Sequence, residues 1–270
     1  VAVTQIDDIY PLAPMQQGML FHSLYEQNVG AYVNQMRLNV TGLDPQGLRD
    51  AWQQAMDAHD ILRTSFVWQG ELQQPVQVVH KQLTLPMVCH DWQQRADLQP
   101  ALDKLARERL QQRFDLARAP LLDVQVIQTG EAQHHLIYTV HHILMDGWSN
   151  SQLMGEILQR YAGQTLPARM GRYRDYIAWL QRQDSSASQA WWAAQLATLQ
   201  EPTRLASSLV SVPTTATGHG NHYQHFGIVE TRYFNEFARR QKVTLNTLLQ
   251  GAWLLLLHHY TGQDSLCFGA

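Results

Sequence analysis

Residues 134–163 read HHLIYTVHHILMDGWSNSQLMGEILQRYAG. Residues 133–140 predict a strand and residues 149–163 predict a helix. Between the two, HHILMDGWS (141–149) brings two imidazoles, a carboxylate and a glycine close together. Three explanations are open for this loop: a metal site, a turn that carries a serine nucleophile, or a polar loop with no function of its own. The rest of the chain has to decide between them.

The composition is that of a globular protein with neither a nucleic-acid nor a membrane partner. The 270 residues are enough for one large domain or two modest ones; 45% are hydrophobic and 16% are charged. The net charge is −3, whereas phosphate contacts require a surplus of Lys and Arg. The start of the chain lacks a signal-peptide pattern, and the longest apolar run, AWLLLL at 252–257, is too short for a bilayer. Two isolated cysteines favour free thiols, and we expect a cytoplasmic protein.

Helices and hairpins are mixed along the chain. Pro14 suits the first turn of a helix, and Asp44 before Pro45 predicts the cap of another. The expected helices cover 14–26, 45–59, 98–113, 149–163, 172–184, 188–200, 231–241 and 244–260. The expected strands cover 31–40, 64–68, 74–80, 120–128, 133–140, 222–230 and 264–270. This order predicts an α+β fold with a mixed sheet, and the small, polar residues at 207–220 predict a linker.

Apolar side chains mark the expected core. Leu48, Trp52, Ala55 and Met56 form a stripe along one face of the helix that Asp44 opens. Trp148, Trp191 and Trp192 are also expected in the core, since a large aromatic ring is more often buried than part of a site.

The residues of HHILMDGWS disfavour two of the three explanations. Neighbouring residues of a strand point to opposite faces, so His141 and His142 are badly placed to share one metal ion. A serine nucleophile elbow needs Gly-x-Ser-x-Gly, but Ser151 stands where the last glycine should be, and Ser149 is better explained as the cap of the following helix.

The motif resembles the His-His-x-x-x-Asp-Gly motif of condensation domains of nonribosomal peptide synthetases, which also recurs in related acyltransferases that use CoA or carriers. Three other segments resemble motifs of the same family: YPLAPMQQGMLFHSL (10–24), AHDILRTSF (58–66) and YRDYIAWL (173–180). In the second of these, Ala58 and Asp60 replace the usual Arg and Glu. The four segments occur in the order of the family and cover about 10–180.

The resemblance implies a fold of two chloramphenicol-acetyltransferase-like lobes with a tunnel between them. Residues 1–180 would then be the first lobe, which carries the motif. Residues 181–220 would be a helix and a linker. Residues 221–270 would begin a second lobe, which we expect to be incomplete because the chain ends in an expected strand.

The resemblance also implies the reaction, in which the amine of one thioester-bound aminoacyl group attacks the carbonyl of another. His142 would lie beside the amine, as a proton acceptor, as a group that orients the amine, or as a stabiliser of charge. Gly147 would let the backbone approach the carbonyl, with its N–H toward the oxyanion, or it would occupy a turn with positive φ. His141 would bond internally, and Asp146 would pair with Arg63 to brace the loop.

Partners follow from the same resemblance. The substrates would arrive on the 4'-phosphopantetheine arms of donor and acceptor peptidyl carrier domains, with an adenylation domain in cis, and the chain itself would bind no cofactor or metal. His141 and the order Gly147-Trp148-Ser149 resemble the condensing members, and PMQQGMLFH (14–22) resembles the subtype whose donor ends in a D-residue. Two other functions remain open: a non-catalytic module that docks carrier proteins, and a free-standing acyltransferase that uses CoA.

Overall fold

The computed structural model describes residues 5–25, 32–111, 114–167, 171–199, 201–208 and 223–269. The chain divides into two compact units, Val1–Gln183 and Asp184–Ala270. Most of the expected linker at 207–220 lies outside the described residues. Within the part of the chain that the structure describes, no helix is long and apolar enough to cross a membrane.

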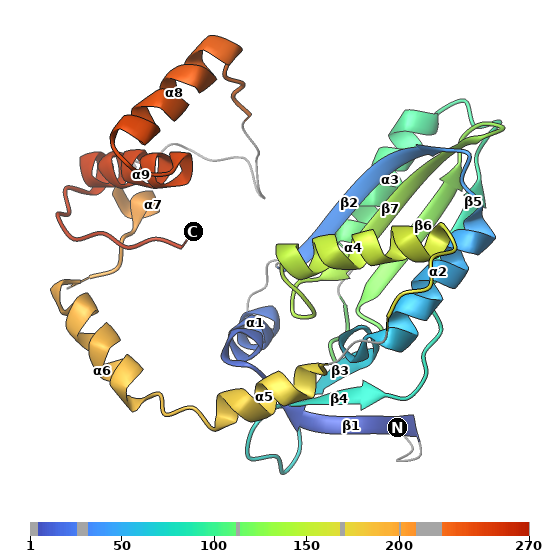
Figure 1. Ribbon diagram of the computed structural model, residues 1–270, viewed down its shortest axis with the longest axis horizontal. Helices are drawn as coiled ribbons and strands as arrows, with labels where there is room; N and C mark the ends of the chain where they lie inside the picture. Colours follow the sequence, from blue (N-terminus) through green and yellow to red (C-terminus); the bar gives the residue numbers. More distant parts are fainter. Residues whose placement is uncertain are drawn as a thin grey trace. The chain divides into compact units, whose positions relative to one another are not determined.

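Two sheets form the first unit (Figure 1). The larger has the order β2 (Val33–Thr41), β7 (Gln133–His141), β6 (Leu122–Gln128) and β5 (Met87–Asp91). Its β5–β6 pair is parallel and its other pairs are antiparallel, which confirms the expected mixed sheet. The smaller sheet has the order β1 (Ile6–Pro11), β4 (Val76–His80) and β3 (Thr64–Val67), and both of its pairs are antiparallel.

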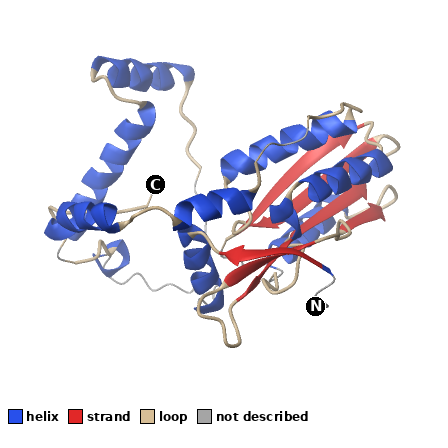
Figure 2. Cartoon of the chain, turned by 60° about the horizontal axis from the view of Figure 1, so that its bottom comes forward, coloured by secondary structure: helices blue, strands red, loops and turns tan. Residues whose placement is uncertain are grey.

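Helices cover both faces of the larger sheet (Figures 1 and 2). On one face, α2 (Pro45–Ala58) and α4 (Gly147–Tyr161) bury apolar side chains against β6 and β7. On the other face, α3 (Leu98–Gln111) packs against Ile127 and Ile137. The stripe expected on α2 is confirmed, because Leu48, Trp52, Ala55 and Met56 are all buried in the first of these layers.

Shorter helices complete the first unit. The helix α1 (Pro14–Tyr25) follows β1, and the 3-10 helix η2 (Asp60–Arg63) joins α2 to β3. The helix α5 (Tyr173–Gln181) packs Ile177 against Tyr10 of β1 and Val79 of β4.

The second unit is helical in its described part. It contains α6 (Ser186–Gln195), η3 (Leu196–Thr198), α7 (Leu205–Ser208), α8 (Ile228–Arg240) and α9 (Leu245–Thr261). Thr244 caps α9, since its hydroxyl accepts a hydrogen bond from the Thr247 backbone N–H. Gly262 ends α9 in the left-handed conformation (φ 70°), which glycine adopts without a steric penalty.

Two predicted strands are wrong. Residues 223–227 are irregular and α8 begins at Ile228, where the Glu230 carboxylate accepts from the Gly227 N–H at the start of the helix. Residues 264–269 form no strand either. A strand needs a partner ladder for its N–H and C=O groups, and neither segment has one among the described residues. Residues 222 and 270 lie outside the described residues.

Three tryptophans also depart from the expectation. Trp52 is buried, but Trp148 is 79% exposed and Trp191 and Trp192 are each more than half exposed.

The two strands that the sequence did not predict are β1, which contains two aspartates and a proline, and β5, which is short and lies at the edge of the larger sheet. Pro and charged residues are typical of such edges and weaken the strand pattern.

Candidate active site

The loop between β7 and α4 fixes the orientation of the His142 ring. His142 is half-buried, and its Nδ1 lies 2.8 Å from the Met145 carbonyl oxygen. A carbonyl oxygen can only accept, so Nδ1 must carry the proton and donate it. In the neutral ring, Nε2 therefore holds the free lone pair, and it has no hydrogen-bond partner among the residues that the structure describes. The backbone N–H of His142 donates to the Tyr32 carbonyl at 2.7 Å.

His141 points into the interior and is bonded there, as the resemblance implied. It is 3% exposed, and its Nδ1 accepts from the Ile143 N–H at 3.1 Å, so its proton lies on Nε2, 3.4 Å from the Ser23 hydroxyl. Burial, and secondarily the charge of His142, lowers the pKa of His141 from 6.5 to about 4. The two imidazoles thus lie in different surroundings, and His141 is a neutral, internally bonded ring at pH 7.

The lowered pKa of His141 makes stability depend on pH. The unfolded chain takes up a proton near pH 6.5 and the folded chain only near 4, so the stability is fully present above about 6.5 and is lost as the pH falls to 4. Over this interval the loss is about 3 kcal/mol. The test is the free energy of unfolding of the chain and of His141→Asn, whose side chain does not titrate, between pH 7 and pH 4.

We expect the difference in free energy of unfolding between the wild type and His141→Asn to shrink as the pH falls from about 6.5 to about 4. His80 and His135, whose pKa values burial also lowers, are present in both proteins and cancel in the difference. A constant difference between the two proteins from pH 7 to pH 4 would show that His141 titrates alike in the folded and unfolded chains.

Asp146, not Ser149, caps α4. The Asp146 carboxylate accepts from the Ser149 backbone N–H at 2.8 Å, and the helix begins at Gly147. This bond holds the pKa of Asp146 below its ordinary range. The predicted cap at Ser149 is wrong because the helix already begins before it. The Asp146 carboxylate, three residues earlier, bonds to one of the first backbone N–H groups of the helix, which have no acceptor within it. The alternative of a positive φ at Gly147 is also wrong, and an added Cβ there would meet no atom of the described residues within 4 Å.

The expected ion pair of Arg63 and Asp146 is not formed. The Arg63 guanidinium is buried and donates to Asp60 Oδ1 at 3.0 Å. It also donates to the backbone carbonyls of Met56, Asp57, His80 and Lys81. Asp146 is exposed and bonds within its own helix turn. Arg63 therefore braces η2 against the end of β4, while Asp146 supports the loop through the start of α4.

Two residues that the sequence did not single out hold the loop from outside. The Gln16 amide on α1 donates to the Ile143 carbonyl at 3.2 Å. Tyr32, which accepts from the His142 N–H, has φ 62°, a left-handed backbone that is unusual for a bulky residue. Gln16 lies within a segment that the resemblance marks, but no pattern of residues indicates that an amide on α1 will reach this loop.

A buried ionic cluster fixes α4 against α2. The Glu156 carboxylate lies 2.9 Å from His59 Nε2, at the end of α2, and 2.8 Å from the Arg160 guanidinium. At the other end of the pair, the Asp44 N–H donates to the Tyr161 hydroxyl at 2.9 Å. These contacts and the apolar layer between the helices anchor α4, which directly follows the loop, against α2.

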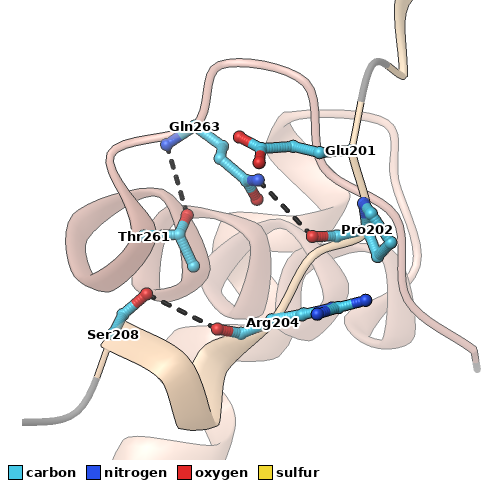
Figure 3. Close-up of a pocket in the computed structure, with 6 residues that line it drawn as sticks. All are labelled: Glu201, Pro202, Arg204, Ser208, Thr261 and Gln263. Carbon is cyan, nitrogen blue, oxygen red and sulfur yellow. Dashed lines mark hydrogen bonds between the residues drawn. The ribbon is translucent and has the colours of Figure 1, made fainter.

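Two cavities lie in the second unit, and neither is lined by a residue of 141–149. One has a volume of about 480 Å³ and is surrounded by mostly polar groups (Figure 3): Glu201, Pro202, Arg204, Ser208, Thr261 and Gln263. The other has a volume of about 780 Å³ and is lined mainly by apolar residues of α8, α9 and the segments that flank α9. Neither contains the imidazole pair, so the site remains the loop of the first unit.

Comparison with known proteins agrees with these observations. The sequence matches the Condensation domain family over residues 6–270. It is 38% identical over 279 residues to a linear gramicidin synthase polypeptide of Brevibacillus parabrevis and 32% identical over 273 residues to a plipastatin synthase polypeptide of Bacillus subtilis (strain 168). Each match covers 98% of this chain, but the chain spans only 5% of the first relative and 8% of the second.

Solved condensation domains share the fold. The condensation domain of Monacolin K polyketide synthase superposes with a TM-score of 0.74 at 19% identity, covering 96% of this chain and 61% of that one. The first condensation domain of the calcium-dependent antibiotic synthetase superposes with a TM-score of 0.72 at 17% identity, covering 98% of this chain and 66% of that one. The expected α+β, chloramphenicol-acetyltransferase-like fold is confirmed by these likenesses and by the mixed sheet. The chain belongs to the condensation-domain family.

Proposed function

We propose that this chain joins a donor peptidyl or aminoacyl thioester to an acceptor aminoacyl thioester by an amide bond, as part of a nonribosomal peptide synthetase. Both substrates arrive on the 4'-phosphopantetheine arms of peptidyl carrier domains, an adenylation domain lies in cis, and the chain needs no cofactor of its own. The family and the synthase relatives support this proposal. Residues 1–180 are the first lobe, 181–220 a helix and linker, and 221–270 begin the second lobe.

The observation that carries the proposal is the contact of His142 Nδ1 with the Met145 carbonyl oxygen at 2.8 Å. A thioester is already activated, so the reaction needs no enzyme nucleophile, but the attacking amine has to lose a proton. The bond from Nδ1 to Met145 leaves Nε2 able to accept this proton. As the new C–N bond forms, Nε2 takes the proton from the amine. The C–S bond of the donor then breaks, and the proton passes to the leaving thiolate of the donor arm.

Gly147 supports the same step from the start of α4. The first N–H groups of a helix have no acceptor within it, and this end of the helix carries partial positive charge. We assign the Gly147 N–H to the oxyanion that forms on the donor carbonyl. Because an added Cβ would meet no atom within 4 Å in the described part of the chain, the glycine leaves room for the substrate, and the fold of this part does not require it.

This assignment predicts that Gly147→Ala folds normally and loses activity. Alanine favours a helix over glycine by about 0.5–1 kcal/mol, so the variant should be at least as stable as the wild type. Its Cβ stands where the donor carbonyl approaches, so the rate of amide formation should fall. Unfolding in denaturant and turnover, measured on the same preparation, check both. Full activity in Gly147→Ala would show that the donor carbonyl does not approach the Gly147 backbone closely.

Loaded carriers test the proposed function directly. The full-length protein is mixed with a donor carrier and an acceptor carrier that bear defined aminoacyl groups, and mass spectrometry follows the dipeptidyl thioester on the acceptor. A wild-type protein that never forms this product from any donor would contradict the proposal. Free aminoacyl-CoA, offered in place of the carriers, tests the alternative of a CoA-dependent acyltransferase.

The same assay identifies the donor stereochemistry. We propose a donor that ends in a D-residue, on the resemblance of PMQQGMLFH and AHDILRTSF to that subtype. Donors that end in the D- and L-forms of one residue compete on the same carrier, and the D-form should dominate the product. Equal amounts, or an excess of the L-product, would refute the subtype.

A further inference from the structure

Gln16 is a buried amide that joins three parts of the first unit. It lies on α1 and is 5% exposed. Its Oε1 accepts from the Ala13 N–H at 3.0 Å and from Gln77 Nε2 at 3.2 Å. Its Nε2 donates to the Ile143 carbonyl at 3.2 Å, across 127 residues of sequence. A side chain that uses both ends of its amide in this way has its orientation fixed.

Gln77 fixes the far end of this arrangement. It lies on β4 with 0% exposure, and its Nε2 also donates to the Pro11 carbonyl of β1 at 2.9 Å. The Gln16 amide is therefore attached to the smaller sheet on one side and to the loop after β7 on the other. The Gln16 amide oxygen already accepts from two donors, Ala13 and Gln77. The amide nitrogen is therefore the end of the side chain that bonds to the loop.

The bond to Ile143 acts on the residue that follows His142. His142 itself is held through its N–H, by Tyr32, and through its ring, by Met145. Of these three attachments, the one to Met145 lies within the loop, and those to Tyr32 and Gln16 come from outside it. Without Gln16 the buried Ile143 carbonyl would lose its side-chain donor, and an unsatisfied buried carbonyl favours a shift of the peptide that exposes it.

We propose that Gln16 is a positioning residue for His142. It does not touch the substrate; it holds the Ile143 peptide so that Nε2 of His142 faces the amine. This inference rests on the proposed function for its effect on rate. A displacement of about 1 Å at a reacting group lowers the rate on the order of 100-fold, even when the altered residue is remote from the chemistry.

The experiment compares Gln16→Met with Gln125→Met in the full-length protein. Methionine keeps the length and the apolar volume of glutamine and removes both hydrogen-bonding ends. Gln125 is the matched control, because it is also buried in the first unit, with 0% exposure. Its amide bonds to His90 on β5 and Asp123 on β6, and neither of these residues belongs to the loop. Both variants should lose stability. Only Gln16→Met should lose kcat, on the order of 100-fold, with unchanged apparent KM for the two loaded carriers.

A second measurement does not depend on turnover. The NMR signal of the His142 Cε1–H, assigned through His142→Gln, reports the surroundings of the ring. Gln16→Met should shift it and Gln125→Met should leave it in place. If Gln16→Met does not fold, Gln16→Asn, which is one methylene too short to reach Ile143 and Ala13 together, takes its place. Wild-type kcat and an unshifted His142 signal in the Gln16 variant would overturn the proposal. A wild type that forms no amide would instead refute the proposed function, and the NMR comparison would still decide the role of Gln16.

Discussion

Replacement of His142 by Ala should lower the rate of amide formation by about 10²–10⁴-fold, the range that a well-placed general acid–base group contributes. Nε2 is the atom that receives the proton, and His141 cannot replace it, because His141 faces the interior and is bonded at both nitrogens. The residual rate reflects the alignment of the two thioesters, which the variant retains. The measurement is the formation of the dipeptidyl thioester from loaded carriers under single-turnover conditions.

The loss of rate in His142→Ala reports on catalysis only if the variant is folded. His142 is half-buried, and its ring makes one hydrogen bond among the described residues, to Met145 in its own loop, so its loss should cost little stability. His141→Ala is the matched control, since it removes a buried ring from the same loop and should act mainly on the free energy of unfolding. Wild-type turnover in His142→Ala would mean that the amine loses its proton to another group.

Much of the fold follows from the sequence because the relevant signals are local. The run of apolar and β-branched residues in 133–140 favours a strand, and that strand is found in the structure. The Asp44-Pro45 start of α2 and the apolar stripe of that helix also depend on neighbouring residues, and both are found. The different surroundings expected for His141 and His142 rest on the geometry of a strand, and β7 ends at His141. The position of the loop between a strand and a helix was therefore predictable from the residues, whereas the internal bonding of His141 was expected from the resemblance.

The contacts across the fold were not predictable in the same way. The resemblance paired Arg63 with Asp146, but η2 places Asp60 three residues before Arg63, and a local carboxylate is reached at a smaller cost in chain entropy. The bond from Gln16 to Ile143 spans 127 residues, and no pattern in the sequence of either segment indicates that the two residues are in contact. Likewise, HYQHFGIVE (222–230) contains aromatic and β-branched residues that favour a strand. Its last residues instead form the first turn of α8, where the Glu230 carboxylate accepts from the Gly227 N–H.

Arg63→Ala should destabilise the chain by about 3–5 kcal/mol, the largest expected loss of stability from a single charged side chain here. Arg63 is 5% exposed, and its guanidinium donates to one carboxylate and several backbone carbonyls at once. Its removal leaves those buried acceptors without donors. Arg63→Lys should recover only part of the loss, because one ammonium cannot reproduce a planar fork that reaches groups on η2 and β4 together. Chemical denaturation of the chain measures the three free energies.

A double-mutant cycle then shows which carboxylate, Asp60 or Asp146, pairs with Arg63. Asp60 contacts the guanidinium at 3.0 Å, so the losses from Arg63→Ala and Asp60→Ala should not add. Asp60 also accepts from Arg172 at 2.8 Å, which reduces the coupling but does not remove it. Asp146→Ala should cost about 1 kcal/mol, as the loss of a helix cap does, and should add to Arg63→Ala to within roughly 0.5 kcal/mol, since the two share no partner. Strong coupling between Arg63 and Asp146, with none between Arg63 and Asp60, would show that in solution the guanidinium leaves η2 and braces the His142 loop directly.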